Sequence, residues 1–149
     1  MVGNLPYRIT SQVLLKVLRE RVRGGAFLVQ WEVGEKLVAP PGPRASRLGT
    51  HLRAYYQLEL LGRVPRTVFF PRPEVDAALL RLRQLPRPLI TAPPESFERT
   101  LAILFGTRRK TLRRALASVL TLPQVDRLLA ELELDPRRRG ESLELGELD

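Results

Sequence analysis

The tetrapeptide Asn4-Leu5-Pro6-Tyr7 places two oxygen acceptors and a flat aromatic ring directly after a short apolar stretch. Pro6 favours an extended conformation for Leu5 and so fixes the direction of the Leu5 carbonyl. The Asn4 side chain offers a second acceptor, and Tyr7 offers a face for stacking. Such a set suits the exocyclic amino group of a nucleobase, because accepting both N–H hydrogens stabilises the charge that develops when this nitrogen attacks an electrophile. The same four residues could equally form a simple turn after a strand.

The charge of the chain indicates a polyanionic partner. The 149 residues contain 25 Lys and Arg against 16 Asp and Glu, a formal net charge of +9. Residues 1–93 carry the whole excess, whereas residues 94–149 hold equal numbers of both signs. Nucleic acid is the usual partner of such a chain. The alternative is a thermostable protein with an Arg-rich solvated surface.

Several classes of protein are disfavoured by the composition. With no cysteine and a single histidine, His51, the chain offers neither a disulfide framework nor the ligands of a zinc site or a histidine-based catalytic triad. No stretch approaches the roughly 20 apolar residues that cross a bilayer, and no signal-peptide pattern is visible. We therefore expect a cytoplasmic protein without a metal centre.

Strand and helix patterns alternate over the first two thirds of the chain. A buried strand ends at Asn4, and a helix follows over 9–22, with Thr10 or Ser11 as its N-cap and Gly24-Gly25 at its end. The next expected features are a strand over 26–33, a loop over 39–45, a helix capped by Ser46, and an antiparallel pair of strands over 57–64 and 75–85. This order predicts the back half of an open α/β sheet.

The rest of the chain reads as a small all-α region. Residues 83–96 have the proline density of a linker. Short helices are expected over 95–106, 108–120 and 123–133, with a possible further one after Glu141. The sequence thus predicts two domains, 1–88 with the sheet and 89–149 with the helices.

A basic segment opens the second of these helices. Its cations are Arg108, Arg109 and Lys110 in the expected first turn, followed by Arg113 and Arg114. The helix dipole disfavours cations there, so a sequence that keeps them is suited to presenting charge to phosphates. The alternative is a solvated basic face.

Four stretches together resemble a known family. The segment "GNLPY" is similar to the catalytic motif of adenine N6-methyltransferases, and most resembles that of the ribosomal RNA adenine dimethyltransferase family (KsgA/RsmA). Three further stretches match that family in order and spacing: "LVQWEVGEKLVAPPGPRASRLG" (28–49), "VPRTVFFPRPEVDAALLRL" (64–82) and "FGTRRKTLRRAL" (105–116). The resemblance covers essentially the whole chain.

The resemblance implies a Rossmann-like methyltransferase sheet with a terminal hairpin, followed by a helical RNA-binding domain. It also implies a function: the use of S-adenosylmethionine to dimethylate two adjacent adenines in a hairpin near the 3′ end of small-subunit (16S) ribosomal RNA, within the pre-30S particle during ribosome biogenesis. Asn4 and the Leu5 carbonyl would take the adenine amino group, with Asn4 also close to the cofactor. Tyr7 would stack on the base, and Phe69, with Pro71 nearby, would border its pocket.

The chain departs from the family pattern at several positions. Trp31 stands where a lysine is common, Glu74 also replaces a lysine, and Ala77 replaces a serine. For Phe69, a core aromatic under the hairpin is the alternative role.

The largest departure is the lack of a glycine-rich loop after a strand, which in the family binds the cofactor. The opening strand resembles the family's fourth, so a truncation, a mis-called start codon or a split gene is expected. The chain alone is predicted neither to bind S-adenosylmethionine tightly nor to methylate RNA. Three rival functions are an Erm-type enzyme acting on large-subunit RNA, a non-catalytic RNA-binding or assembly factor, and, less favoured, a DNA adenine methyltransferase.

Overall fold

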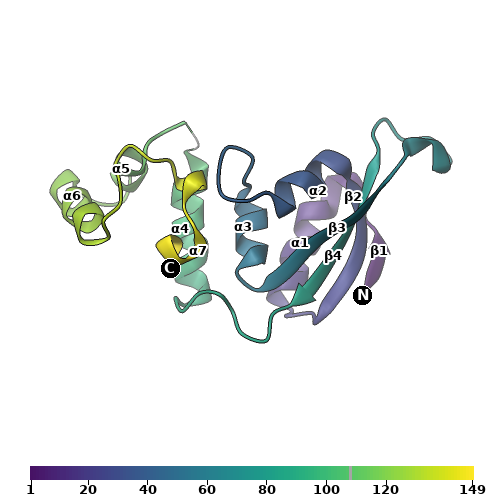
Figure 1. The fold of residues 1–149 in the computed structure, drawn as a ribbon, viewed down its shortest axis with the longest axis horizontal. Coiled ribbons are helices and arrows are strands. Elements are labelled where there is room, and N and C mark those ends of the chain that lie inside the picture. The colour runs from purple at the N-terminus through teal and green to yellow at the C-terminus, as the bar shows by residue number, and fades with distance from the viewer. Residues whose placement is uncertain (108) are drawn as a thin grey trace.

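A computed structural model describes residues 1–107 and 109–149, and it shows a four-stranded sheet with helices on one face and a second group of helices beside them (Figure 1). The sheet region comprises β1 (Val2–Asn4), a 3₁₀ turn (Tyr7–Ile9), α1 (Thr10–Arg19), β2 (Gly24–Gln30), α2 (Trp31–Val38), α3 (Arg47–Arg53), β3 (Tyr56–Val64), a 3₁₀ turn (Arg66–Val68) and β4 (Ala77–Gln84). The helical region comprises α4 (Pro94–Gly106), α5 (Leu112–Leu116), α6 (Leu122–Glu131), a 3₁₀ turn (Gly140–Ser142) and α7 (Leu145–Leu148).

The strands follow the order β1-β2-β4-β3 across the sheet. β1 runs parallel to β2, whereas β4 is antiparallel to both β2 and β3. The predicted hairpin of β3 and β4 is therefore confirmed, as is the mixed α/β class. β1 and β3 form the two edges of the sheet.

One hydrophobic core lies between the sheet and the helices α1, α2 and α3, which Figure 1 shows on the same side of the strands. Side chains two residues apart in β2 (Phe27, Val29) and in β4 (Ala78, Leu80, Leu82) face these helices, as the two-residue period of a strand requires. Burying each of the larger side chains stabilises the fold by about 1.5–3 kcal/mol.

A second core is built mainly from the helical region. Phe97 and Leu101 of α4 and Val125 and Leu129 of α6 are buried members of this core. Ala45 and Ala54, which flank α3, also belong to this core. Figure 1 accordingly shows α4 alongside α3, and an ion pair joins Arg47 to Glu98 across them at 3.7 Å.

The structure corrects both ends of the predicted helix 9–22. Neither Thr10 nor Ser11 is the N-cap: the cap is Ile9, and the Thr10 hydroxyl donates instead to the Pro6 carbonyl at 3.3 Å. The helix ends at Arg19, and Gly24-Gly25 begins β2. Close packing of the backbone requires glycine at both positions. A Cβ on Gly25 would lie 2.7 Å from the Met1 carbonyl oxygen, and a Cβ on Gly24 would lie 2.7 Å from the Leu82 carbonyl oxygen.

The predicted strand 26–33 was too long at its end, and the helix that follows it was missed. β2 stops at Gln30, and Trp31 begins α2, whose buried face includes Gly34 and Leu37. A Cβ on Gly34 would meet the Ala78 side chain at 2.9 Å, so glycine lets α2 approach the sheet closely. The predicted cap Ser46 is confirmed, since its hydroxyl accepts a hydrogen bond from the Gly49 N–H at 3.0 Å.

The predicted helix 108–120 is also much shorter than expected. Within the described residues α5 covers only Leu112–Leu116, with the Thr111 hydroxyl as its cap. Arg109 and Lys110 therefore precede the helix instead of occupying its first turn, and Arg108 lies outside the described residues. The argument from the helix dipole does not apply to them.

Candidate functional site

Three segments leave the sheet at the same end. β1 ends at Asn4, which pairs with Leu28 of the parallel strand β2. Gln30 at the end of β2 pairs with Ala77, and Ala77 also pairs with Val64 at the end of β3. The tetrapeptide, the start of α2 and the connection between β3 and β4 consequently share this end, where open α/β sheets bind ligands.

Hydrogen bonds at Leu5 and at Pro6 hold the backbone of the tetrapeptide in place. The Leu5 N–H donates to the Leu28 carbonyl at 3.1 Å, and the Leu5 side chain is buried. Pro6 has φ −57° and ψ 131°, and its carbonyl accepts hydrogen bonds from the Ile9 N–H at 3.0 Å and from the Thr10 hydroxyl. The chain is thus held in one conformation as it leaves the sheet.

Two oxygen acceptors of the tetrapeptide remain available. In the part of the chain that the structure describes, no donor is bonded to the Leu5 carbonyl or to the Asn4 side chain. Asn4 is exposed, and Tyr7 is half-buried at the start of the first 3₁₀ turn. The arrangement can therefore accept two hydrogen bonds from a ligand next to an aromatic ring.

Phe69 and Pro71 lie in the connection between β3 and β4, at the same end of the sheet. Phe69 is half-buried, whereas Pro71 is exposed and follows a cis peptide bond. Phe69 belongs to neither described hydrophobic core, so the alternative role as a core aromatic is not supported. Between residues 4–7 and these two residues, the described part of the chain has no hydrogen bond or ring contact.

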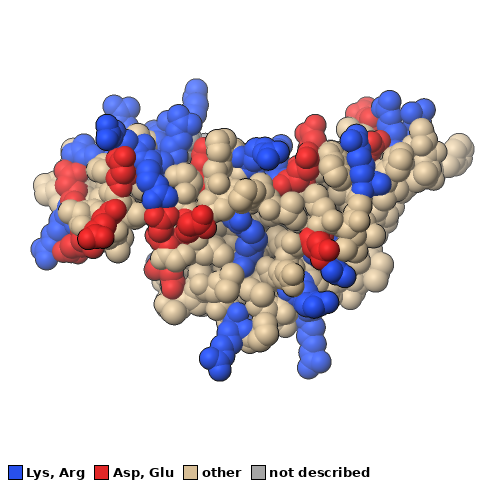
Figure 2. Space-filling view, viewed as in Figure 1, with Lys and Arg blue, Asp and Glu red and all other residues tan. Residues whose placement is uncertain are grey.

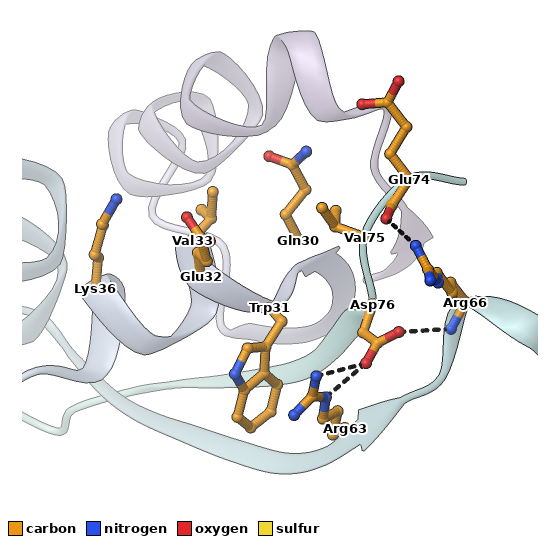
Figure 3. A pocket seen from close by; sticks show the side chains of 10 residues that line it. All are labelled: Gln30, Trp31, Glu32, Val33, Lys36, Arg63, Arg66, Glu74, Val75 and Asp76. Atoms are coloured by element: carbon orange, nitrogen blue, oxygen red, sulfur yellow. Dashed lines mark hydrogen bonds and ion pairs between the residues drawn. The ribbon is translucent and has the colours of Figure 1, made fainter.

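A hollow of about 520 Å³ opens beside this connection (Figure 3). Its lining residues are Gln30, Trp31, Glu32, Val33, Lys36, Arg63, Arg66, Glu74, Val75 and Asp76. Asp76 organises it, because its carboxylate accepts from the Arg63 Nε at 2.7 Å and from the Arg66 backbone N–H at 2.9 Å. Both bonds lower the pKa of Asp76, and the bond from the Arg66 backbone N–H has the larger effect. The sequence reasoning missed this site, since Arg63 and Asp76 meet only through the strand register.

A second hollow, of about 650 Å³, lies between α1, α3, the 85–92 connection and α4. His51 and Tyr55 line it, and their ring centroids are 6.0 Å apart. Burial lowers the pKa of His51, although Glu98 opposes the shift. The Tyr55 hydroxyl is shielded from solvent and has no hydrogen-bond partner in the described residues.

The predicted RNA-binding cations are not equivalent. Arg109, Lys110 and Arg114 are exposed, whereas the Arg113 guanidinium is held by Asp126 of α6 through bonds of 2.6 and 2.8 Å. Figure 2 shows Lys and Arg side chains along the upper edge of the molecule, both over the helical region and near the β3–β4 connection. RNA binding by these residues stays a prediction.

The comparisons with known proteins identify the family. The model of the family described as ribosomal RNA adenine dimethylase matches residues 1–144. The chain therefore belongs to the ribosomal RNA adenine dimethylase family. Proteins of Bacillus mycoides, Bacillus cereus and Bacillus anthracis, each named ribosomal RNA small subunit methyltransferase A, are 40% identical over 156 residues. The match covers 99% of this chain and 53% of each relative, so the chain spans about half the length of these relatives.

Two solved structures share the fold. A dimethyladenosine transferase from Plasmodium falciparum superposes with a TM-score of 0.85 at 20% identity, covering 99% of this chain and 62% of that one. The 23S rRNA methyltransferase ErmE superposes with a TM-score of 0.71 at 23% identity, covering 99% and 61%. None of the described helices is long and apolar enough to cross a membrane.

The described residues do not fit S-adenosylmethionine, the methyl donor that the resemblance implies. Gly24-Gly25 is the one pair of adjacent glycines, and both residues are paired with β4. Their peptide groups therefore belong to the sheet and cannot form a glycine-rich loop after a strand. Neither hollow described above is lined by Asn4.

Proposed function

We propose that this chain is the base-positioning and RNA-binding part of a ribosomal RNA adenine N6-dimethyltransferase. Its substrate would be two adjacent adenines in the 3′-terminal hairpin of small-subunit ribosomal RNA, in the pre-30S particle and in the cytoplasm. The carrying observation is a pair of acceptors, Asn4 and the Leu5 carbonyl, at the carboxyl end of β1, to which no donor among the described residues is bonded. Family membership and the 40% identity to small-subunit enzymes support the choice of substrate.

In this proposal the acceptors hold the adenine amino group. The Asn4 Oδ1 and the Leu5 carbonyl would each accept one N6 hydrogen, which fixes the orientation of the amino group and would stabilise positive charge on its nitrogen. Tyr7 stacks on the base, and Phe69 with Pro71 borders its pocket. Removing one such oriented group costs about 10²–10³-fold in kcat in comparable sites.

The helical region would hold the RNA backbone. We assign this role to Arg108, Arg109, Lys110 and Arg114, because cations contacting phosphates supply sequence-independent affinity. Arg113 would contribute through its pairing with Asp126, which joins α5 to α6. We also propose the division into domains 1–88 and 89–149, supported by the two hydrophobic cores.

The methyl donor is S-adenosylmethionine in this proposal, and it supplies the methyl group. Because the described residues do not fit it, the donor would be held by a segment that the relatives carry beyond the matched half. We accordingly expect the 149-residue chain alone to transfer no methyl group.

The experiment is a chimera that joins the unmatched part of the Bacillus cereus relative to Met1 of this chain. Small-subunit particles lacking the modification and, separately, unmodified large-subunit RNA are incubated with the chimera and S-adenosylmethionine, and modified adenosines are quantified by mass spectrometry. We expect N6,N6-dimethyladenosine at two adjacent positions. Modification of large-subunit RNA instead would support the Erm-type alternative and overturn the proposed substrate.

A second function is favoured by one observation, the absence of a cofactor loop from the described residues. In that case the chain is a non-catalytic RNA-binding or assembly factor. The same chimera decides between them: small-subunit RNA binding without any methyl transfer would support the non-catalytic function.

A further inference from the structure

We propose that the hollow beside Trp31 binds the base of a single-stranded RNA nucleotide, the neighbour of the adenine at Asn4. The inference rests on the proposed function, because that function places RNA at this end of the sheet. Its own support comes from the stacking surface, the hydrogen-bonding groups and the charge balance of the hollow.

The stacking surface consists of Trp31 and Arg63. The Arg63 guanidinium carbon lies 5.2 Å from the centre of the indole ring. The Arg63 guanidinium is also bonded to the Asp76 carboxylate, and the Trp31 backbone N–H donates to the Asp76 backbone carbonyl at 2.9 Å. Unpaired RNA bases stack on aromatic rings and on guanidinium planes, and one such stack contributes about 1–3 kcal/mol.

The hollow also offers hydrogen-bonding groups that are not bonded to any described residue. Among residues 1–107 and 109–149, the side chains of Gln30, Glu32 and Glu74 have no hydrogen-bond or ion-pair partner. In Figure 3 the Gln30 amide lies between the other two side chains. An amide presents a donor and an acceptor together, the pattern that pairs with the N6 and N7 atoms of adenine.

The charges of the hollow favour a base over a free phosphate. Its three cations, Lys36, Arg63 and Arg66, are matched by three carboxylates, Glu32, Glu74 and Asp76. Because the carboxylates repel an anion, a phosphate alone has little net attraction to the interior. An uncharged base can lie inside, with its phosphate at the exposed Arg66.

The position of the hollow suits the neighbour of the target nucleotide. Gln30 ends the strand that pairs with β1, and the Leu5 N–H is bonded to Leu28 of the same strand. The hollow therefore begins on the strand next to the tetrapeptide, two residues beyond the Leu28 pairing.

Trp31 is the only tryptophan, so its fluorescence reports on this hollow directly. The 149-residue chain is titrated with hexaadenylate, hexauridylate and inorganic phosphate. We expect saturable quenching by hexaadenylate, at least fivefold weaker binding of hexauridylate, and no response to phosphate. An unchanged spectrum with hexaadenylate, or equal quenching by phosphate, would overturn the proposal.

Substitutions provide the second test. Arg63→Lys keeps the charge and loses the planar group, and we expect it to weaken hexaadenylate binding about five- to tenfold. Arg81→Lys is the matched control, since Arg81 is paired with Glu59 elsewhere on the sheet, and it should bind as the parent does. Circular dichroism verifies that both variants are folded. Equal affinities of the two variants would contradict the assignment.

The two proposals fail separately. Methyl transfer by the chimera without Trp31 quenching would refute only the neighbour site. Quenching by RNA without methyl transfer would refute only the enzymatic function and keep the hollow as an RNA site.

Discussion

Two adjacent tyrosines should respond in opposite ways to the loss of their hydroxyl groups. The Tyr56 hydroxyl lies 3.0 Å from the Val22 carbonyl and 3.2 Å from the Val17 carbonyl. The Tyr55 hydroxyl is equally shielded from solvent but has no partner in the described residues. Burial raises the pKa of both tyrosines, so both hydroxyls are neutral at pH 7.

The magnitudes follow from these bonds. Tyr56→Phe removes the hydroxyl donor, so the Val22 carbonyl loses this hydrogen bond. The Val17 carbonyl still accepts a hydrogen bond from the Val22 backbone N–H at 3.1 Å. One lost hydrogen bond together with one unsatisfied carbonyl lowers the free energy of unfolding by about 1–2 kcal/mol. Tyr55→Phe removes a buried group that is already unsatisfied, so we expect no loss and a gain of up to about 1 kcal/mol.

The assay is urea unfolding at pH 7, followed by circular dichroism, with each variant compared to the parent. The midpoint should fall for Tyr56→Phe and stay or rise for Tyr55→Phe, with the same slope in all three proteins. The Tyr55 ring contact with His51 is kept in phenylalanine. An equal loss of stability in the two variants would refute the reasoning.

Three further predictions concern other parts of the molecule. Because burial lowers the pKa of His51, the unfolded chain takes up a proton at a higher pH than the folded one does. The free energy of unfolding should therefore fall as the pH drops from 7.5 to 5.5. In urea titrations, His51→Gln should make the free energy of unfolding less dependent on pH. Arg114→Gln should weaken RNA binding and reduce the slope of log affinity against log salt concentration by about one unit. Arg113→Gln should chiefly lower the melting temperature, because it breaks the pairing with Asp126. Equal salt slopes in the two variants would contradict these different roles. Gly25→Ala would place a Cβ 2.7 Å from the Met1 carbonyl oxygen, so it should lower the melting temperature, while Gly62→Ala, which meets nothing within 4 Å, serves as the control.

The hairpin, the Ser46 cap and most of the element order were predictable, because they depend on local patterns. The alternation of Ala78, Leu80 and Leu82 is visible in the sequence and matches the buried face of β4. Errors arose where packing overrides local preference. Gly24-Gly25 resembles a helix end, but the glycines are needed because neighbouring backbone approaches β2 closely.

The candidate site was predictable in part. The tetrapeptide could be found because its residues are consecutive and its acceptors follow from their types. The hollow around Asp76 could not, because it depends on pairing between β3 and β4 and on the start of α2, which the sequence reading assigned to a strand. The length of α5 was overestimated because the apolar positions continue through Val119 and Leu120, which the structure leaves exposed outside the helix.

The most direct test of the central claim is the methyl-transfer rate of the chimera with Asn4→Ala, against Gln12→Ala on the exposed side of α1 as control. If Asn4 and the Leu5 carbonyl hold the adenine amino group, kcat should fall about 10²–10³-fold in Asn4→Ala with RNA affinity unchanged, and Gln12→Ala should match the parent. An Asn4→Ala chimera that methylates at the parental rate would contradict the account.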